Sequence, residues 1–326
     1  METTTPTVEL KNLSQKLLNA DVNNNEELLS ILNEMYQIYQ ELTGINGKDE
    51  DLEHLACLPA ETGVALSLNH AAACFLDYRR TTKFLKGFVQ AIKDKQKKHP
   101  NETIKIFYAG CGPFAPFVTL IAPMFGKDEV QFSVLEINEK SLKIAKKLIR
   151  QLGLTDYVNE YYQADAIKFE IPNADEYHIL FSETLDALLN RECYVPILWN
   201  LLPQLRKDIT VVPENVVIKL NFKKGSEEVY ESDVFDVRKV LRETEKTKEL
   251  PQKFAQTSVS LSDAEKYDSV ILDTAVFVYK EHFLERCESS LSMALEIPIH
   301  KPITHKAVEF IYSLKPEPAL QLEMRE

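Results

Sequence analysis

Apolar residues recur with helical spacing along the first hundred residues of the chain. From Glu26 to Leu42 they return every three or four positions, which predicts an amphipathic helix. A second helical stretch is expected from Ala65 to Lys95, with an interruption around Asp77 to Thr82. We therefore predict a helical N-terminal cover over residues 1–100.

Short apolar runs then alternate with helical patterns over residues 101–222. Between two of these runs, Lys140 to Leu152 is an amphipathic helix that ends at Gly153. Strands separated by helices predict an α/β fold with a Rossmann-like parallel sheet, whose ligands bind at the carboxyl ends of the strands. The candidate strands are Ile104–Ala109, Gln131–Glu136, Tyr157–Ala164, Tyr177–Phe181 and Ile209–Phe222.

The pattern changes again over residues 223–326. Charged and turn-forming residues fill Lys223 to Asp263, and several β-like runs follow. They predict a small β-rich C-terminal domain, either an antiparallel sheet or a small barrel. The runs are Ser269–Tyr279, Ser289–Ile299, Ala307–Leu314 and Leu320–Met324.

Composition and charge exclude several classes of function. The net charge of −12 argues against a nucleic-acid partner, which needs a basic face, and suits a cationic or small neutral substrate. No apolar run is long enough to span a bilayer, so no membrane association is expected. Five scattered cysteines form no CxxC pair and predict free thiols in a cytoplasmic protein. No metal site is predicted, because no His or Cys cluster has ligand spacing.

Three strand ends carry candidate ligand-binding residues. The first strand runs into a tight turn that contains Gly110 and Gly112, where a ligand can approach the backbone closely. The second strand ends at Glu136, a position suited to the hydroxyls of a ribose. A third glycine is missing, so the turn is not the dinucleotide fingerprint. Asp165 follows the third strand, where it can either receive an adenine amino group or cap the next turn.

The turn and its partner acid resemble motif I of the class I S-adenosylmethionine methyltransferases. After the fourth strand, Glu183 and Glu192 stand nine positions apart, which resembles the double-glutamate loop of the protein arginine methyltransferases. Upstream, Asp77-Tyr-Arg-Arg80-Thr81 resembles that family's N-terminal helix motif, whose arginine pairs with the carboxylate of the cofactor. Downstream, the segment around Val212-Pro213 resembles the one that leads into the family's barrel.

The resemblance implies an S-adenosylmethionine-dependent enzyme that methylates a guanidinium or amine nitrogen in a peptide, protein or metabolite. Arg80, Gly110, Gly112, Glu136 and Asp165 would hold the cofactor. Glu183 and Glu192 would hold the cationic acceptor, although both can also be surface acids at the start of the next helix.

Departures from the family keep other functions open. Thr184-Leu185-Asp186 stands where the family has Trp-Met-Gly, and the family's Thr-His-Trp motif is missing. One alternative is an aminocarboxypropyl transferase of the nicotianamine synthase type, and another is a cofactor-binding scaffold without catalysis. A homodimer is one allowed assembly.

Overall fold

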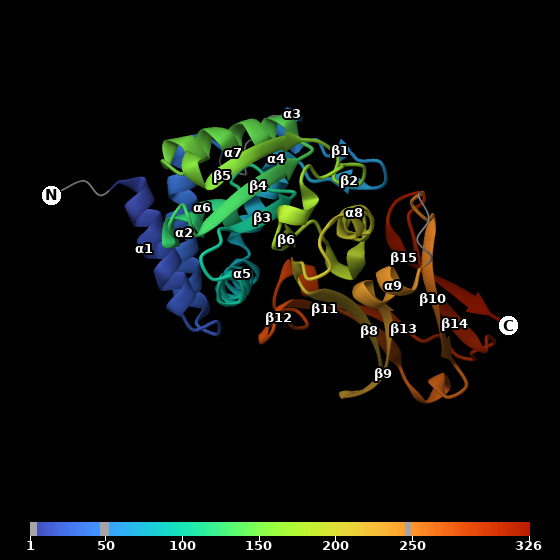
Figure 1. The fold of residues 1–326 in the computed structure, drawn as a ribbon. Helices are drawn as coiled ribbons and strands as arrows, with labels where there is room; N and C mark the ends of the chain where they lie inside the picture. The colour runs from blue at the N-terminus through green and yellow to red at the C-terminus, as the bar shows by residue number, and fades with distance from the viewer. Residues whose placement is uncertain (1–4, 46–51, 245–248) are drawn as a thin grey trace.

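The computed structural model of the chain describes residues 5–45, 52–244 and 249–326. Helices of the N-terminal part cover one side of a parallel sheet, and two antiparallel sheets form the C-terminal part (Figure 1). In the described part of the chain, no helix is both long and apolar enough to cross a membrane.

The N-terminal cover is helical, as its apolar spacing predicts. The side chain of Asn24 accepts a hydrogen bond from the amide of Glu27 and so caps the second helix, which ends at Gly44 with a φ of 82°. Asp77 caps the long fifth helix, so the predicted interruption around Asp77 is confirmed. The helices are α1 (Pro6–Asn19), α2 (Asn25–Thr43), α3 (Leu52–Leu55), α4 (Leu68–Ala73) and α5 (Tyr78–Lys98).

A five-stranded parallel sheet forms the core, in the order β5-β4-β3-β6-β7. The chain builds outward from β3 to β5 and then returns to the other side of β3, so strand order reverses between β3 and β6. The predicted Rossmann-like fold class is confirmed by this topology. The strands are β3 (Ile104–Ala109), β4 (Val130–Glu136), β5 (Val158–Gln163), β6 (Ile179–Ser182) and β7 (Thr210–Val212). The helices that follow strands of this sheet are α6 (Pro116–Thr119), α7 (Glu139–Gln151) and α8 (Tyr194–Leu201).

Aromatic packing fixes α5 against this sheet. The rings of Phe88 on α5 and Phe181 on β6 stack with centroids 4.5 Å apart, and Phe117 packs beside Phe181 with centroids 4.6 Å apart. All three side chains are buried, and buried aromatic residues contribute much of the apolar area of a core. The start of α5, which carries Arg80, is therefore held in a defined position above the strand ends.

The C-terminal part contains two antiparallel sheets joined by α9 (Val237–Glu243). In one sheet the order is β12-β11-β8-β9, with β13 paired to β11, and in the other it is β10-β14-β15. The strands are β8 (Asn215–Lys224), β9 (Glu227–Asp236), β10 (Lys253–Ser260), β11 (Ser269–Tyr279), β12 (His282–Leu284), β13 (Leu295–Pro298), β14 (Ala307–Ser313) and β15 (Ala319–Arg325).

Four sequence predictions in this region are wrong in detail. The single strand predicted over Ile209–Phe222 is two strands, β7 and β8, because Pro213 has no amide hydrogen to continue a ladder. The second sheet therefore begins at Asn215, ahead of the boundary predicted at residue 222. Lys223 to Asp263, expected to be turn-rich, contains β9, α9 and β10. Within Ser289–Ile299 only β13 is a strand, and Ser290–Ser292 forms a 3-10 turn.

Candidate active site

One cavity at the carboxyl ends of β3, β4 and β6 brings all the predicted site residues together. The strand-end position follows from the topology, because the reversal of strand order opens a crevice there. The cofactor and acceptor candidates that line the cavity are Arg80, Gly110, Gly112, Glu136, Asp165, Glu183 and Glu192.

The glycine turn after β3 needs glycine for two reasons. Gly110 and Gly112 have φ angles of 78° and 64°, in the left-handed region that favours glycine. A Cβ atom on Gly110 would also lie 2.3 Å from the Cγ2 atom of Thr184, whereas one on Gly112 would lie 4.0 Å from Ala71 on α4. The turn is thus packed against the glutamate loop on one side and opens toward the N-terminal cover on the other.

Glu136 is buried at the end of β4 and faces this turn. Its Oε2 atom accepts a hydrogen bond from the amide of Gly112 at 2.8 Å, and its Oε1 atom accepts one from the amide of Asn138 at 2.9 Å. Burial raises the pKa of the carboxyl group, and the amide hydrogen bonds act in the opposite direction. Each oxygen keeps a lone pair that a ligand hydroxyl can use.

Asp165 both caps a turn and lines the cavity. Its Oδ1 atom accepts from the amide of Ile167 and its Oδ2 atom from the amide of Glu61, each at 2.9 Å. Glu61 lies in the hairpin formed by β1 (Leu58–Pro59) and β2 (Val64–Ala65), whose residues also line the cavity. Asp165 therefore connects the core sheet to a hairpin of the N-terminal cover.

Arg80 and Glu183 form an ion pair inside the cavity. Arg80 is only 6% exposed, and its guanidinium Nε atom contacts the carboxylate of Glu183. Burial raises the pKa of Glu183, and the charge of Arg80 acts against that rise. The residue expected to hold the cofactor and one expected to hold the acceptor are therefore joined, so a change at Glu183 will also act on Arg80.

Glu192 is the second acid of the loop. Nearby cations compensate its negative charge less than Arg80 compensates that of Glu183. Burial is the main cause that raises its pKa to about 8, and the negative charges of Glu183 and Asp186 add to the rise. Arg80 and Arg191 act in the opposite direction. A positive charge that enters the cavity would therefore favour the ionised form of this carboxyl group.

The loop between these two acids is held by the C-terminal sheets. Leu188, Leu189 and Arg191 have φ angles of 57°, 55° and 63°, which are strained for residues other than glycine. The amide of Leu188 donates to Thr274 on β11 at 2.7 Å, and the hydroxyl of Tyr312 on β14 donates to the carbonyl of Leu189 at 3.1 Å. The C-terminal domain therefore fixes the shape of the loop that carries Glu183 and Glu192.

A second contact fixes the start of α5. The Oδ1 atom of Asp77 accepts from the amide of Arg80 at 3.3 Å. Its Oδ2 atom accepts from the hydroxyl of Ser289, and from the amide and hydroxyl of Ser290, each at 2.8 Å. Asp77 thus links the helix that carries Arg80 to the C-terminal domain. The sequence pointed to Asp77 only as part of a motif, and nothing in it indicated the two serines.

We expect Asp77→Ala to destabilise the protein more than the loss of an ordinary helix cap. Loss of a capping side chain costs about 0.5–2 kcal/mol, and hydrogen bonds to a charged group contribute roughly 1.5–3 kcal/mol. The matched control is Asn24→Ala, which removes the cap of α2 without an interdomain contact. Urea unfolding measures both variants. Equal losses of unfolding free energy would show that the serine contacts add nothing.

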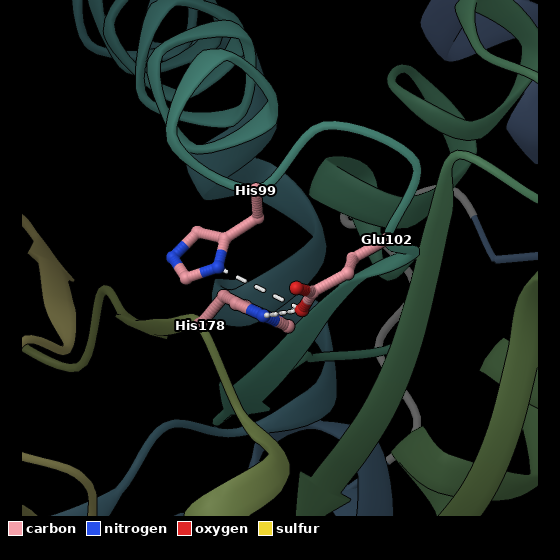
Figure 2. Close-up of side chains that lie close together, drawn as sticks. All are labelled: His99, Glu102 and His178. Carbon is pink, nitrogen blue, oxygen red and sulfur yellow. Dashed lines mark ion pairs between the residues drawn. The ribbon is translucent and has the colours of Figure 1, made fainter.

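A separate group of metal-type side chains lies at the opposite ends of the strands. His99, Glu102 and His178 point toward one another (Figure 2), with ligand atoms within 4.8 Å of one another. The Nδ1 atom of His178 accepts the amide of Lys105 at 3.1 Å, so its Nε2 atom carries the proton and has no lone pair for a metal. Nε2 instead lies 3.5 Å from the carboxylate of Glu102. In the part of the chain that the structure describes, this group is best explained as a polar contact between the segment after α5 and the residue that precedes β6.

Comparison with solved structures finds matches of low sequence identity. The chain is similar to protein arginine methyltransferase 10 of Arabidopsis thaliana, with 10% identity, a TM-score of 0.42 and coverage of 76% of this chain and 97% of that chain. It is also similar to the PRMT1 enzyme–prozyme heterotetrameric complex of Trypanosoma brucei with AdoHcy, with 8% identity, a TM-score of 0.44 and coverage of 76% and 98%.

A third similar structure is a putative S-adenosyl-L-methionine-dependent methyltransferase of Methanococcus maripaludis, with 16% identity, a TM-score of 0.31 and coverage of 43% of this chain and 61% of that chain. No protein-family model matches the sequence, and no curated protein matches it significantly.

Proposed function

We propose that the chain is an S-adenosylmethionine-dependent methyltransferase that acts on the nitrogen of a cationic guanidinium or amine acceptor. The observation that carries this proposal is the single cavity that joins the glycine turn, the strand-end acid Glu136, the Arg80–Glu183 pair and Glu192.

The residues of the cavity fit the cofactor. Gly110 and Gly112 let a nucleoside approach the backbone, and Glu136 offers free lone pairs to ribose hydroxyls. Arg80 is the cation among the lining residues, and it provides donors for an amino-acid carboxylate. When bound, S-adenosylmethionine supplies an electrophilic methyl group on a sulfonium ion. The apolar walls formed by Phe114, Phe117 and Leu135 exclude water from the reaction.

The acids of the cavity favour a cationic acceptor. Glu136, Asp165, Glu183 and Glu192 outnumber Arg80, so the ionised cavity carries net negative charge. A carboxylate can hold a guanidinium with paired hydrogen bonds and direct one nitrogen at the methyl group. Glu192, with its raised pKa, is a stronger proton acceptor than an ordinary glutamate and suits removal of the proton from the attacking nitrogen.

The two alternatives differ in what they require of the cavity. An aminocarboxypropyl transferase attacks a different carbon of the same cofactor, so it needs the acceptor on the side of the amino-acid chain. A scaffold needs no acceptor site. Burial of the Glu192 carboxyl group destabilises the folded protein, and a scaffold has no function for that group. Two acids of one loop, Glu183 and Glu192, line the same cavity as the cofactor candidates, and this favours an enzyme with a cationic acceptor over a scaffold.

An acceptor screen tests this function. The protein is incubated with methyl-labelled cofactor and with arginine-containing peptides, free amines and guanidines, or neutral hydroxylated and carboxylic metabolites. We expect label only in the cationic classes, because neutral acceptors gain nothing from the acids of the cavity. Label that appears only in neutral acceptors would overturn the proposed acceptor class while leaving methyl transfer in place.

A further inference from the structure

A second cavity lies on the other side of α8. Ile197 of this helix lines the candidate active site, whereas Leu198 and Trp199 line the second cavity. Its remaining walls come from the 3-10 turn Leu202–Gln204, the segment that leads to β7, and α9. Figure 1 shows α8 and α9 close together between the core sheet and the C-terminal sheets. The cavity is thus a cleft between the two parts of the fold, separate from the candidate active site.

The walls of this cleft are apolar. They carry one aromatic ring and several branched side chains, which can bury an aliphatic or aromatic body. Trp199 is only partly buried, although its ring packs edge-on against Phe254 with centroids 5.6 Å apart. The apolar residues that matter here are Leu198, Trp199, Leu202, Leu205, Ile209 and Leu241.

The charged residues of the cleft are all cations. Arg206, Lys207, Arg238 and Arg242 line it, and no acid does, in a chain whose net charge is −12. Arg206 is paired with Asp208. Within the described residues, the side chains of Lys207, Arg238 and Arg242 have no ion pair or hydrogen bond. The lining of the cleft therefore concentrates positive charge, of which the ion pair with Asp208 neutralises only Arg206 directly.

Arg238 is the least satisfied of these cations. Its Nη1 atom is buried and has no hydrogen-bond partner in the described part of the chain. Burial is the main cause that lowers the pKa of its guanidinium, and nearby Arg242 also lowers it, while Tyr194, Asp236 and Glu214 act in the opposite direction. Arg238 as a whole is half-buried, and a partly desolvated cation without a hydrogen-bonded acid is less stable than a paired one. An anion bound in the cleft beside Arg238 and Arg242 would supply negative charge near both guanidinium groups.

We propose that this cleft binds an anionic amphiphile, a small molecule with an apolar chain or ring that ends in a carboxylate or phosphate. The apolar body would lie along α8 against Trp199 and the leucines, and the anion would reach Arg238 and Arg242 on α9. The positive charge of the cleft repels a cationic ligand. Its apolar walls provide no hydrogen bonds for a small inorganic anion. This site does not depend on the proposed methyl transfer.

Trp199 provides a direct measurement, because it is the only tryptophan of the chain. Decanoate and decyl phosphate, each below its micelle concentration, are titrated into the full-length protein while tryptophan fluorescence is recorded. Decanol and decyltrimethylammonium are the neutral and cationic controls. We expect a saturable change with at least one of the two anions, and the tighter of them identifies the preferred headgroup. The Kd of decanol should be at least about tenfold higher than that of the tighter anion, because decanol lacks the charge-assisted hydrogen bonds.

Variants distinguish binding of the anion in the cleft from its nonspecific binding elsewhere on the protein surface. Arg238→Gln and Arg242→Gln should each raise the Kd for the anion about tenfold, and Arg150→Gln, an exposed arginine on α7, should leave it unchanged. Arg242 is exposed, so its variant decides the question if Arg238→Gln does not fold. The inference is overturned if neither anion gives a saturable change, if decanol binds as tightly as the anions, or if the cleft variants keep the wild-type Kd.

Discussion

Glu192→Gln is expected to lose most of its turnover of a cationic acceptor while its affinity for S-adenosylhomocysteine changes little. Removing one partner of a desolvated charge pair costs about 2–5 kcal/mol, which corresponds to a loss of roughly 30-fold to several thousand-fold. In the wild type, kcat/KM should rise with pH until about 8, because burial raises the pKa of Glu192 to about 8 and the ionised form binds the cation. The glutamine variant should lack this rise.

The control for this variant is Glu160→Gln, an exposed glutamate on β5 that lines neither cavity. It should keep the turnover and the pH profile of the wild type. Glu183→Gln is a different case, because it leaves the buried Arg80 without its partner. We expect that variant to lose turnover and also to change cofactor affinity. Wild-type turnover in Glu192→Gln would show that the loop is a structural helix start and not an acceptor site.

Glu136→Ala is expected to weaken the binding of S-adenosylhomocysteine by about 10- to 150-fold. Hydrogen bonds that involve a charged group contribute roughly 1.5–3 kcal/mol, and Glu136 is the acid at the end of β4 beside the glycine turn. Titration calorimetry measures the change. Glu136→Gln keeps the shape of the side chain and should lose less affinity.

Glu139→Ala is the matched control for this prediction. Glu139 lies three residues later on α7, and its carboxylate pairs with Lys143 on the exposed face of that helix. Its variant should bind the cofactor product normally. If Glu136→Ala folds and binds S-adenosylhomocysteine with unchanged affinity, the ribose assignment is wrong and the cofactor lies elsewhere.

The sequence predicts the buried elements of the fold better than the exposed ones. The strands Ile104–Ala109 and Ser269–Tyr279 have the predicted bounds, because each is a continuous apolar or alternating run inside a sheet. Strand β9 was missed because it is an edge strand whose first five residues, Glu227 to Glu231, are all exposed. The exposed first half of this strand has neither face buried, so it leaves no hydrophobic period to detect, and only Val234 and Phe235 near its end are buried.

The sequence likewise predicts some residues of the candidate site and not others. Gly110, Glu136 and Glu183 could be predicted because a parallel sheet brings successive strand ends to one edge. Thr274 and Ser289 could not, since they contact the site from 86 and 212 positions away along the chain. The pairing of Arg80 with Glu183 was likewise missed, because two motifs recognised separately do not show that their side chains meet.

The product left from the cofactor tests the central proposal most directly. The protein is incubated with S-adenosylmethionine and the acceptor found in the screen, and the nucleoside products are separated and identified by mass spectrometry. Methyl transfer predicts S-adenosylhomocysteine in amounts equal to the methylated acceptor, with the amounts of both strongly reduced in Glu192→Gln. Methylthioadenosine would instead identify aminocarboxypropyl transfer, and an unchanged cofactor across all acceptor classes would contradict an enzymatic role for this cavity.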